Sequence, residues 1–217
     1  MNKRSAISAI EKHGILLVYP LQNRPEPLSL WSTHWPRTKM KWEWNEDSDD
    51  RVSDLWQLRS ELSTTRKVVY AKFYQGRATF FSREIFTALL ALMHSADYKA
   101  CKLKSDSKNI MELLDTTSPL STKRIKKEAD LKGKFHEASY TRALKELWNK
   151  LLIVGFGEVD DGAFPSLAVG STELLFEDLW SEAKEIDLNE ARITVIKKLG
   201  PQKSLLIWMK KHCGLTL

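Results

Sequence analysis

The stretch "YTRALKELWNKLLIVGFGEVDDGAFPSLAVG" (residues 140–170) changes its apolar period halfway along and decides the fold. Its apolar residues first recur at alternating steps of three and one, which is typical of an amphipathic helix with one buried face. Two β-rich runs follow, "LLIVGFGEV" and "GAFPSLAVG", on either side of Asp160, Asp161 and Gly162, a turn sequence suited to a tight hairpin. The stretch therefore predicts a helix followed by a β-hairpin.

Two shorter helices are expected before this one. Ser107 can cap the first, which "TTSP" ends, and Ser121 can cap the second, which begins in "LSTKRIKKEADL". Three helices followed by a hairpin is the order of a winged helix-turn-helix, in which the third helix enters the major groove of DNA. Residues 106–170 fit this order.

The charge of the same region favours a polyanionic partner. Residues 120–150 hold nine basic and four acidic side chains, a net charge of +5. The residues that we expect to contact phosphates or base edges are Lys123, Arg124, Lys126, Lys127, Lys132, Lys134, Thr141, Arg142, Lys145 and Asn149. The acidic hairpin tip is unusual for a wing that meets DNA, and winged helices also serve as protein–protein modules.

The first half of the chain predicts a related unit. "DDRVSDLWQLRSEL" is typical of a helix with Val52, Leu55, Trp56 and Leu62 turned inward. "VVYAKFY" and "RATFF" predict a hairpin, Ser82 can cap the helix after it, and "GILLVYP" predicts a strand or a buried extended segment.

The polar, aperiodic stretch at residues 98–106 predicts a boundary between these halves. We expect an N-terminal winged-helix-like domain (1–100), a winged helix-turn-helix domain (101–182) and a C-terminal helical hairpin (183–217) that resembles the start of a further winged helix. The predicted fold class is α+β, with tandem winged helix-turn-helix units that are mostly helical and carry small hairpin wings.

Composition narrows the class of protein. The 217 residues carry a formal charge of +6 with a pI near 9.2, which favours nucleic acid as the partner. Two cysteines give neither a disulfide framework nor a metal-binding cluster, and no apolar run reaches the length of a membrane span. We expect a cytoplasmic protein that needs no metal or cofactor and does not bind a membrane.

Several segments together resemble a known family. They are "GILLVYPLQNRPEPLSLW", "VVYAKFYQGRATFFSREIF", "PLSTKRIKKEADLKGK", "YTRALKELWNKLLIVGFGEVDDGAFPSLAVGSTELLFEDLW" and "EARITVIKKLG". In this order they resemble segments of proteins related to AlkZ and YcaQ, the bacterial interstrand-crosslink-repair DNA glycosylases. The resemblance covers most of residues 14–199. It implies tandem winged helices with a concave basic surface for DNA, and removal of alkylated bases without a metal or organic cofactor.

The sequence departs from this family at the catalytic motif. In the active relatives, a Gln-x-Gln or Gln-x-Asp motif orients water and stabilises the oxocarbenium-like sugar. The glutamines here are Gln22, Gln57, Gln75 and Gln202, and none has Gln or Asp two positions later. The resemblance therefore supports the fold and DNA binding but leaves base excision open.

The stretch "KMKWEWNEDSDDRVSDLW" (residues 39–56) allows three interpretations. In the structural one, Trp31, Trp35 and Trp56 pack a first unit against the predicted strand, and the acidic residues cap the next helix. In the catalytic one, a carboxylate orients water while a tryptophan stacks on an extruded base; the candidates are Glu43, Glu46, Asp49 and Asp50 with Trp42 or Trp44. In the binding one, the tryptophans and nearby cations stack and neutralise unpaired nucleotides.

Three functions follow from these patterns. The leading hypothesis is a bacterial DNA-binding winged-helix protein related to crosslink-repair glycosylases and acting in DNA repair. The second is an active glycosylase that uses a non-standard catalytic carboxylate. The third is a winged-helix module for protein–protein interaction.

Overall fold

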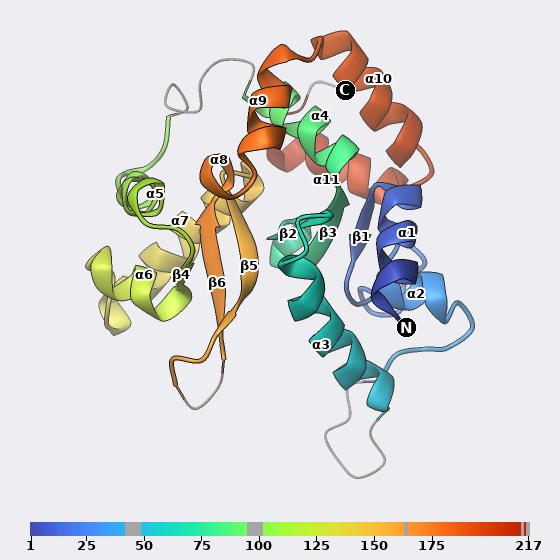
Figure 1. Ribbon diagram of the computed structural model, residues 1–217, viewed down its shortest axis with the longest axis horizontal. Coiled ribbons are helices and arrows are strands. Elements are labelled where there is room, and N and C mark those ends of the chain that lie inside the picture. The colour runs from blue at the N-terminus through green and yellow to red at the C-terminus, as the bar shows by residue number, and fades with distance from the viewer. Residues whose placement is uncertain (42–48, 95–101, 163–164, 214, 216–217) are drawn as a thin grey trace.

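The computed structural model describes residues 1–41, 49–94, 102–162, 165–213 and 215. The α-helices are α1 (Lys3–His13), α2 (Leu30–His34), α3 (Asp50–Ser63), α4 (Arg83–Met93), α5 (Ser105–Thr116), α6 (Thr122–Glu128), α7 (Glu137–Asn149), α8 (Thr172–Leu175), α9 (Glu177–Glu185), α10 (Leu188–Leu199) and α11 (Lys203–Cys213). The strands are β1 (Ile15–Leu17), β2 (Val68–Lys72), β3 (Ala78–Ser82), β4 (Leu120–Ser121), β5 (Ile153–Val159) and β6 (Ser166–Ser171). Two short 3₁₀ turns, η1 (Tyr74–Gly76) and η3 (Lys134–His136), complete these elements (Figure 1).

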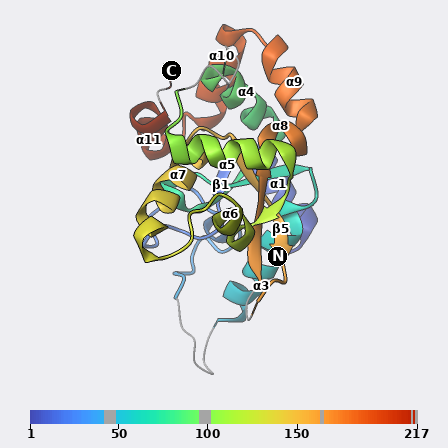
Figure 2. The ribbon, with the colours of Figure 1, turned by 90° about the vertical axis from the view of Figure 1, so that its left-hand side faces the viewer.

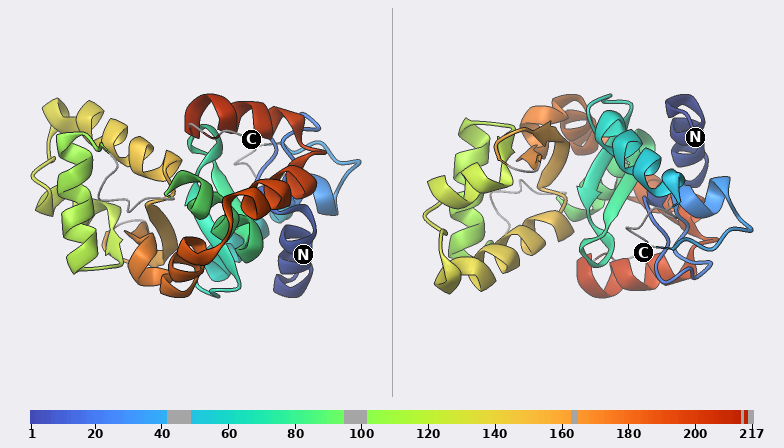
Figure 3. Two further views of the ribbon diagram at one scale, coloured as in Figure 1. Left: turned by 90° about the horizontal axis from the view of Figure 1, so that it is seen from above. Right: turned by 90° about the horizontal axis from the view of Figure 1, so that it is seen from below.

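One antiparallel sheet contains strands from both halves of the chain. Its strand order is β1-β3-β2-β5-β6-β4, so each half contributes a first strand that pairs with its third. Each half also runs in the same order of helix, strand, two helices and hairpin; α4 follows the first hairpin, and α8 and α9 follow the second. The two sets of elements lie at opposite ends of the molecule, with α5–α7 at one end and α1 and α2 at the other (Figure 3). The mixed α+β class predicted from the sequence is confirmed.

The two halves of the sheet join where β2 meets β5. Tyr70 lies opposite Gly155, and a Cβ atom added at Gly155 would stand 2.3 Å from a ring carbon of Tyr70. Two residues further on, the backbone N–H of Gly157 donates to Ser63 Oγ at 2.9 Å, with Gly157 in the left-handed region at φ 77°. Glycine is required at Gly155 because the tyrosine ring occupies the space of a side chain.

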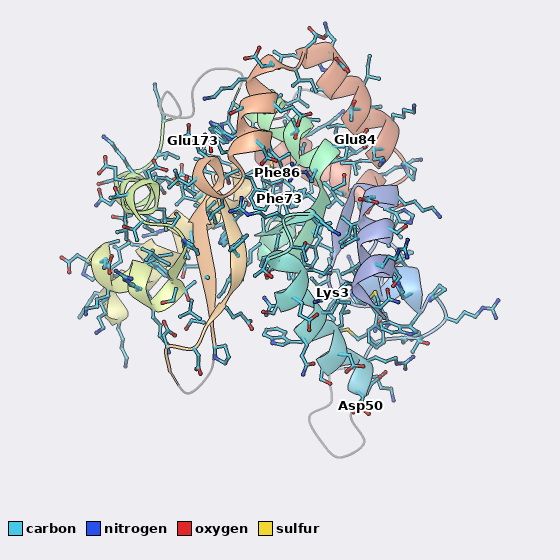
Figure 4. All side chains as sticks on the ribbon, viewed as in Figure 1. Lys3, Asp50, Phe73, Glu84, Phe86 and Glu173 are labelled. Atoms are coloured by element: carbon cyan, nitrogen blue, oxygen red, sulfur yellow. The ribbon has the colours of Figure 1, made fainter. Side chains whose placement is uncertain are left out.

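Both faces of the β1–β3–β2 part of the sheet are buried. Val69 and Phe81 belong to a large core that also contains residues of α4, α7 and α10, whereas Tyr70 and Phe80 belong to a second core with α1, α2 and α3. Figure 4 shows Phe73 near the centre of the molecule, with Phe86 of α4 close above it. Helices on both faces explain why "GILLV" and "VVYA" are continuous apolar runs without the polar alternation of a half-exposed strand.

Helices α5, α6 and α7 gather at one end of the molecule (Figure 2). Two of the predicted caps are confirmed: Ser121 accepts a hydrogen bond from the N–H of Arg124 at the start of α6, and Ser82 accepts one from Ile85 at the start of α4. The cap predicted at Ser107 is wrong. Helix α5 already begins at Ser105, and the buried Ser107 hydroxyl instead donates to Glu146 of α7 at 2.6 Å.

Other sequence predictions have mixed outcomes. The hairpins β2–β3 and β5–β6 and the helix α7 are confirmed, whereas α1 was not foreseen. The predicted boundary at 98–106 falls partly on residues 95–101, which lie outside the described residues. The division into 1–100, 101–182 and 183–217 stays a prediction.

Replacing Gly155 by alanine should destabilise the protein. The new methyl group would overlap the Tyr70 ring, so we expect the free energy of unfolding to fall by about 1–3 kcal/mol, as measured by urea denaturation. Gly162→Ala is the matched control, because its added Cβ would meet only the end of the flexible Lys123 side chain and should change stability by less than about 0.5 kcal/mol. Equal effects of the two substitutions would contradict this account of the junction.

Candidate nucleic-acid interface

A cleft of about 640 Å³ lies between the two halves, beside their junction. The first half lines it from β1 and the residues after it, from α3 and from the β2–β3 hairpin; the second half lines it from α6 and the β5–β6 hairpin. Its polar and aromatic lining residues are Tyr19, Trp56, Arg59, Tyr70, Lys72, Arg77, Thr122, Lys123, Glu158 and Ser166. Its volume is within the range of small-molecule and nucleotide sites in proteins.

A buried ion pair connects the two walls of the cleft. Arg59 of α3 donates through Nη2 to the carboxylate of Glu158 on β5, and the two side chains are only 4% and 19% exposed. The Arg59 guanidinium also stands 4.2 Å from the centre of the Trp56 ring and 5.5 Å from that of Tyr70. These contacts offset the cost of removing the two charges from water.

The environment of the cleft shifts several pKa values. Burial alone would lower the pKa of Arg59, but Tyr70 and Glu158 outweigh it and raise that pKa. Partial loss of water around the Lys72 ammonium group, together with the charge of Arg59, lowers the pKa of Lys72. Burial raises the pKa of Tyr19 to about 12, so the phenol is a neutral hydrogen-bonding group at physiological pH.

Positive charge predominates among the lining residues. Arg59, Lys72, Arg77 and Lys123 carry positive charge, whereas Glu158 is the only carboxylate among the described residues that line the cleft. Such a cleft is suited to an anion with an aromatic part, since it offers cations beside the rings of Trp56 and Tyr19.

The basic residues predicted for DNA contact lie on α6, η3, α7 and the segments between them. On α6, three cations are paired locally: Lys123 lies 3.4 Å from Asp161 of the hairpin tip, Arg124 pairs with Glu128, and Lys126 pairs with Glu137. Four exposed lysines have no carboxylate partner among the described residues; they are Lys127, Lys132, Lys134 and Lys145.

The remaining predicted contact residues lie on α7. Thr141 and Arg142 are exposed, and Arg142 donates to Ser139 Oγ at 3.2 Å. Asn149 is half-buried at the C-terminal end of the helix. Apart from Lys126 and Asn149, which are half-buried, the side chains expected to contact DNA are exposed on α6, α7 and the segment between them.

The acidic hairpin tip has a local explanation. The Lys123 ammonium contacts both the carboxylate and the backbone carbonyl of Asp161, at 3.4 Å and 3.2 Å. Side-chain hydrogen bonds with Ser121 and Ser166 lower the pKa of Asp161 below its usual value, and the Lys123 ammonium lowers it further. Asp161 therefore ties the tip of the hairpin to α6.

The structure describes part of the tryptophan-rich stretch, residues 39–56. Trp42, Glu43, Trp44 and Glu46 lie outside the described residues. Asp49 caps α3, and its hydrogen bonds from Arg51 hold the pKa of its carboxyl group below the ordinary value. Asp50 is the first residue of that helix and is exposed (Figure 4). Neither Asp49 nor Asp50 lines the cleft.

Two of the three tryptophans follow the structural interpretation. Trp31 is buried, its indole N–H donates to the carbonyl of Thr38 at 2.8 Å, and its ring lies 4.8 Å from that of Trp35. The inward position predicted for Trp56 is wrong, because this side chain is 51% exposed. The buried stripe of α3 runs through Leu55, Leu58, Arg59, Leu62 and Ser63, which places Trp56 beside it.

The cleft was not predicted from the sequence. From the sequence, an arginine on a helix such as Arg59 is expected to be exposed to solvent. Its partner Glu158 is 99 positions away in the sequence. The one available signal was the pair Gly155 and Gly157 inside a predicted strand, because glycine there often marks a bulge or a close approach of other atoms.

A family model described as "AlkZ related" matches residues 2–204, which is most of the chain. The chain belongs to the AlkZ-related family. This membership relates it to the DNA-repair glycosylases that its segments resemble. No curated protein and no solved structure gives a significant match.

In this AlkZ-related chain, Gln202 has a structural role. It is buried, accepts a hydrogen bond from the N–H of Leu28 at 3.0 Å and donates to the carbonyl of Ile15 at 3.0 Å. The described residues contain no group of three or more His, Cys, Asp or Glu side chains placed to hold a metal ion. Within the same residues, no helix is long and apolar enough to cross a membrane.

Breaking the Arg59–Glu158 pair from either side should destabilise the protein. We expect Glu158→Leu to lower the free energy of unfolding by about 3–5 kcal/mol, because it leaves the more deeply buried Arg59 charge unpaired. Arg59→Met should cost less, since Glu158 retains access to water, and the double substitution should recover part of the loss. Additive losses in urea denaturation would show that the two side chains are not coupled.

Proposed function

We propose that this AlkZ-related protein binds DNA through one basic surface that includes α6, α7, the turn between them and the adjoining cleft. The observation that carries the proposal is the set of four exposed, unpaired lysines on the helix-turn-helix, next to Lys123, which also lines the cleft. Lys72 and Arg77 add cations from the other half of the chain. Unpaired lysines retain their full charge for phosphates, whereas a locally paired cation must first give up its carboxylate.

We further propose that each half is a winged helix-turn-helix unit. The order of the elements supports this assignment. The second half runs α5, β4, α6, α7, β5 and β6, and β4 pairs with β6. The first half runs α1, β1, α2, α3, β2 and β3, and β1 pairs with β3. On this assignment α7 is the helix that enters the major groove. The β5–β6 hairpin is then tied to α6 by Asp161 rather than projecting freely.

DNA binding should be steeply salt-dependent, because each lysine that reaches a phosphate releases a counterion. We expect Lys127→Gln, Lys132→Gln, Lys134→Gln and Lys145→Gln each to weaken binding to duplex DNA of any sequence. Each should reduce the slope of log K against log salt concentration by about 0.9 per lost contact. Fluorescence anisotropy across a salt series measures both effects.

The matched control is the combined substitution of Lys197, Lys210 and Lys211 by glutamine. These exposed lysines lie in α10 and α11, away from the helix-turn-helix, so the salt slope should not change. Equal losses from both sets would mean that net charge alone drives binding. No binding at low salt would reject the proposal and favour a module for protein partners.

A second candidate function, base excision, is favoured by one carboxylate. Glu158 is partly exposed in the cleft, its orientation is fixed by Arg59, and Trp56 and Tyr19 line the same space. A fixed carboxylate can orient water and stabilise the positive charge that develops on a sugar when a glycosidic bond breaks. We propose Glu158, rather than Asp49 or Asp50, as the carboxylate to test.

The test uses duplex DNA that carries alkylated bases, followed by heating in alkali to convert abasic sites into strand breaks. If Glu158 is catalytic, Glu158→Gln should lower the rate of base release by about 100-fold or more while DNA binding persists. Asp49→Asn is the control and should retain activity. Absence of strand breaks with the unmodified protein would reject base excision and leave the DNA-binding proposal intact.

A further inference from the structure

Phe135 is the most exposed of the large hydrophobic side chains in the described part of the chain. It is 98% exposed, against 68% for Ile207 and 64% for Ile193, and it belongs to neither hydrophobic core. A phenylalanine gains substantial free energy from leaving water. A ring that nothing in the described chain covers is therefore a candidate contact for a partner.

An ordered turn presents this ring. Phe135 is the middle residue of η3, where the N–H of His136 donates to the carbonyl of Gly133 at 3.1 Å. Gly133 has a φ of 102°, and a Cβ there would meet nothing within 4 Å, so the backbone conformation rather than crowding favours glycine. The turn is anchored by Leu131, which is buried and whose N–H donates to the carbonyl of Lys126 at 3.0 Å.

Helix α7, which follows the turn, is also fixed to α6, which precedes it. Tyr140 of α7 donates its hydroxyl to the carbonyl of Thr122 at 2.9 Å, and the Lys126 ammonium lies 4.9 Å from the centre of the Tyr140 ring. Because both sides of the turn are held by such contacts, Phe135 occupies a defined place at the end of the α6–α7 pair. Little backbone ordering is then needed when a ligand covers the ring.

The charges around Phe135 indicate the kind of ligand. Lys132 and Lys134 both precede it in the sequence, are exposed, and have no carboxylate partner among the described residues. Lysine is depleted in the buried centres of protein interfaces, where it would lose its hydration. An exposed aromatic ring close in sequence to two such lysines instead matches nucleic acid, in which bases stack on the ring and phosphates neutralise the cations.

We propose that Phe135 stacks on an unpaired or unstacked base, so that the α6–α7 turn recognises distorted DNA in preference to intact duplex. This inference rests on the proposed DNA binding and adds a discrimination that the lysines alone do not provide. An intact duplex offers no free base face to the ring, and inserting the ring between stacked bases costs unstacking energy. A gap, bulge or mismatch has a base face that is already accessible.

The experiment compares an intact duplex with the same duplex that carries a single-nucleotide gap beside 2-aminopurine. Fluorescence anisotropy gives the two affinities, and the 2-aminopurine emission reports stacking. The wild-type protein should prefer the gapped duplex and quench the emission. Phe135→Ala should reduce this preference by about 5- to 100-fold and leave the salt slope unchanged. Phe135→Trp should retain both properties.

Ile207→Ala is the matched control, because Ile207 is another highly exposed apolar residue but lies on α11. It should bind both duplexes as the wild type does. The melting temperature of Phe135→Ala should equal that of the wild type, and a clear decrease would overturn the proposal by showing that the ring is part of the packing.

The failure of this inference is distinguishable from failure of the proposed function. Wild-type binding to both duplexes without preference, or with a preference that Phe135→Ala retains, would overturn the stacking role alone. No binding to either duplex would reject DNA binding as well, and would leave Phe135 as a contact for a protein.

Discussion

The structure depends on the contact between the Tyr70 ring and the bare backbone of Gly155. Among the described strands, the two halves pair only here, and any side chain at Gly155 would occupy the volume of the ring. The close approach lets α3 lie over β5, where Ser63 accepts a hydrogen bond from Gly157 and Arg59 reaches Glu158. The ion pair, the single sheet and the cleft are all consequences of that approach.

A second consequence concerns the distribution of charge. Two of the cations that line the cleft are paired, Arg59 with Glu158 and Lys123 with Asp161. In the segment between α6 and α7, Lys132 and Lys134 have no carboxylate partner among the described residues. The ion pairs hold neighbouring elements together, whereas the lysines without a carboxylate partner produce a positive electrostatic potential that attracts an anionic partner. Exposed pairs such as Arg124 with Glu128 contribute little to stability, so their main effect is to keep those cations occupied.

Local sequence patterns predicted the elements well, since the forces that form them are local. Helix α7 and both hairpins follow from periodicity and turn residues, and Ser82 and Ser121 mark helix starts. The error at Trp56 has a definite cause. Arg59 looks polar in the sequence but belongs to the buried stripe, which shifts the inward face of α3 away from Trp56.

The cleft was not predictable in the same way. The order of the predicted elements already indicated two related units, but the pairing of their strands into one sheet appears only in the structure. Glu158 and Arg59 meet only because of that pairing, across 99 positions of sequence. The basic residues of α6 and α7, by contrast, were identifiable from composition and helical periodicity alone.

On our proposal, both halves contribute to one nucleic-acid surface beside their junction. Hydrogen exchange measured by mass spectrometry, with and without duplex DNA, tests whether they do. We expect protection in α6, in α7 and in the segments around Trp56 and Lys72 together, with α10 and α11 unchanged. Protection confined to one half, or centred on α10 and α11, would contradict it.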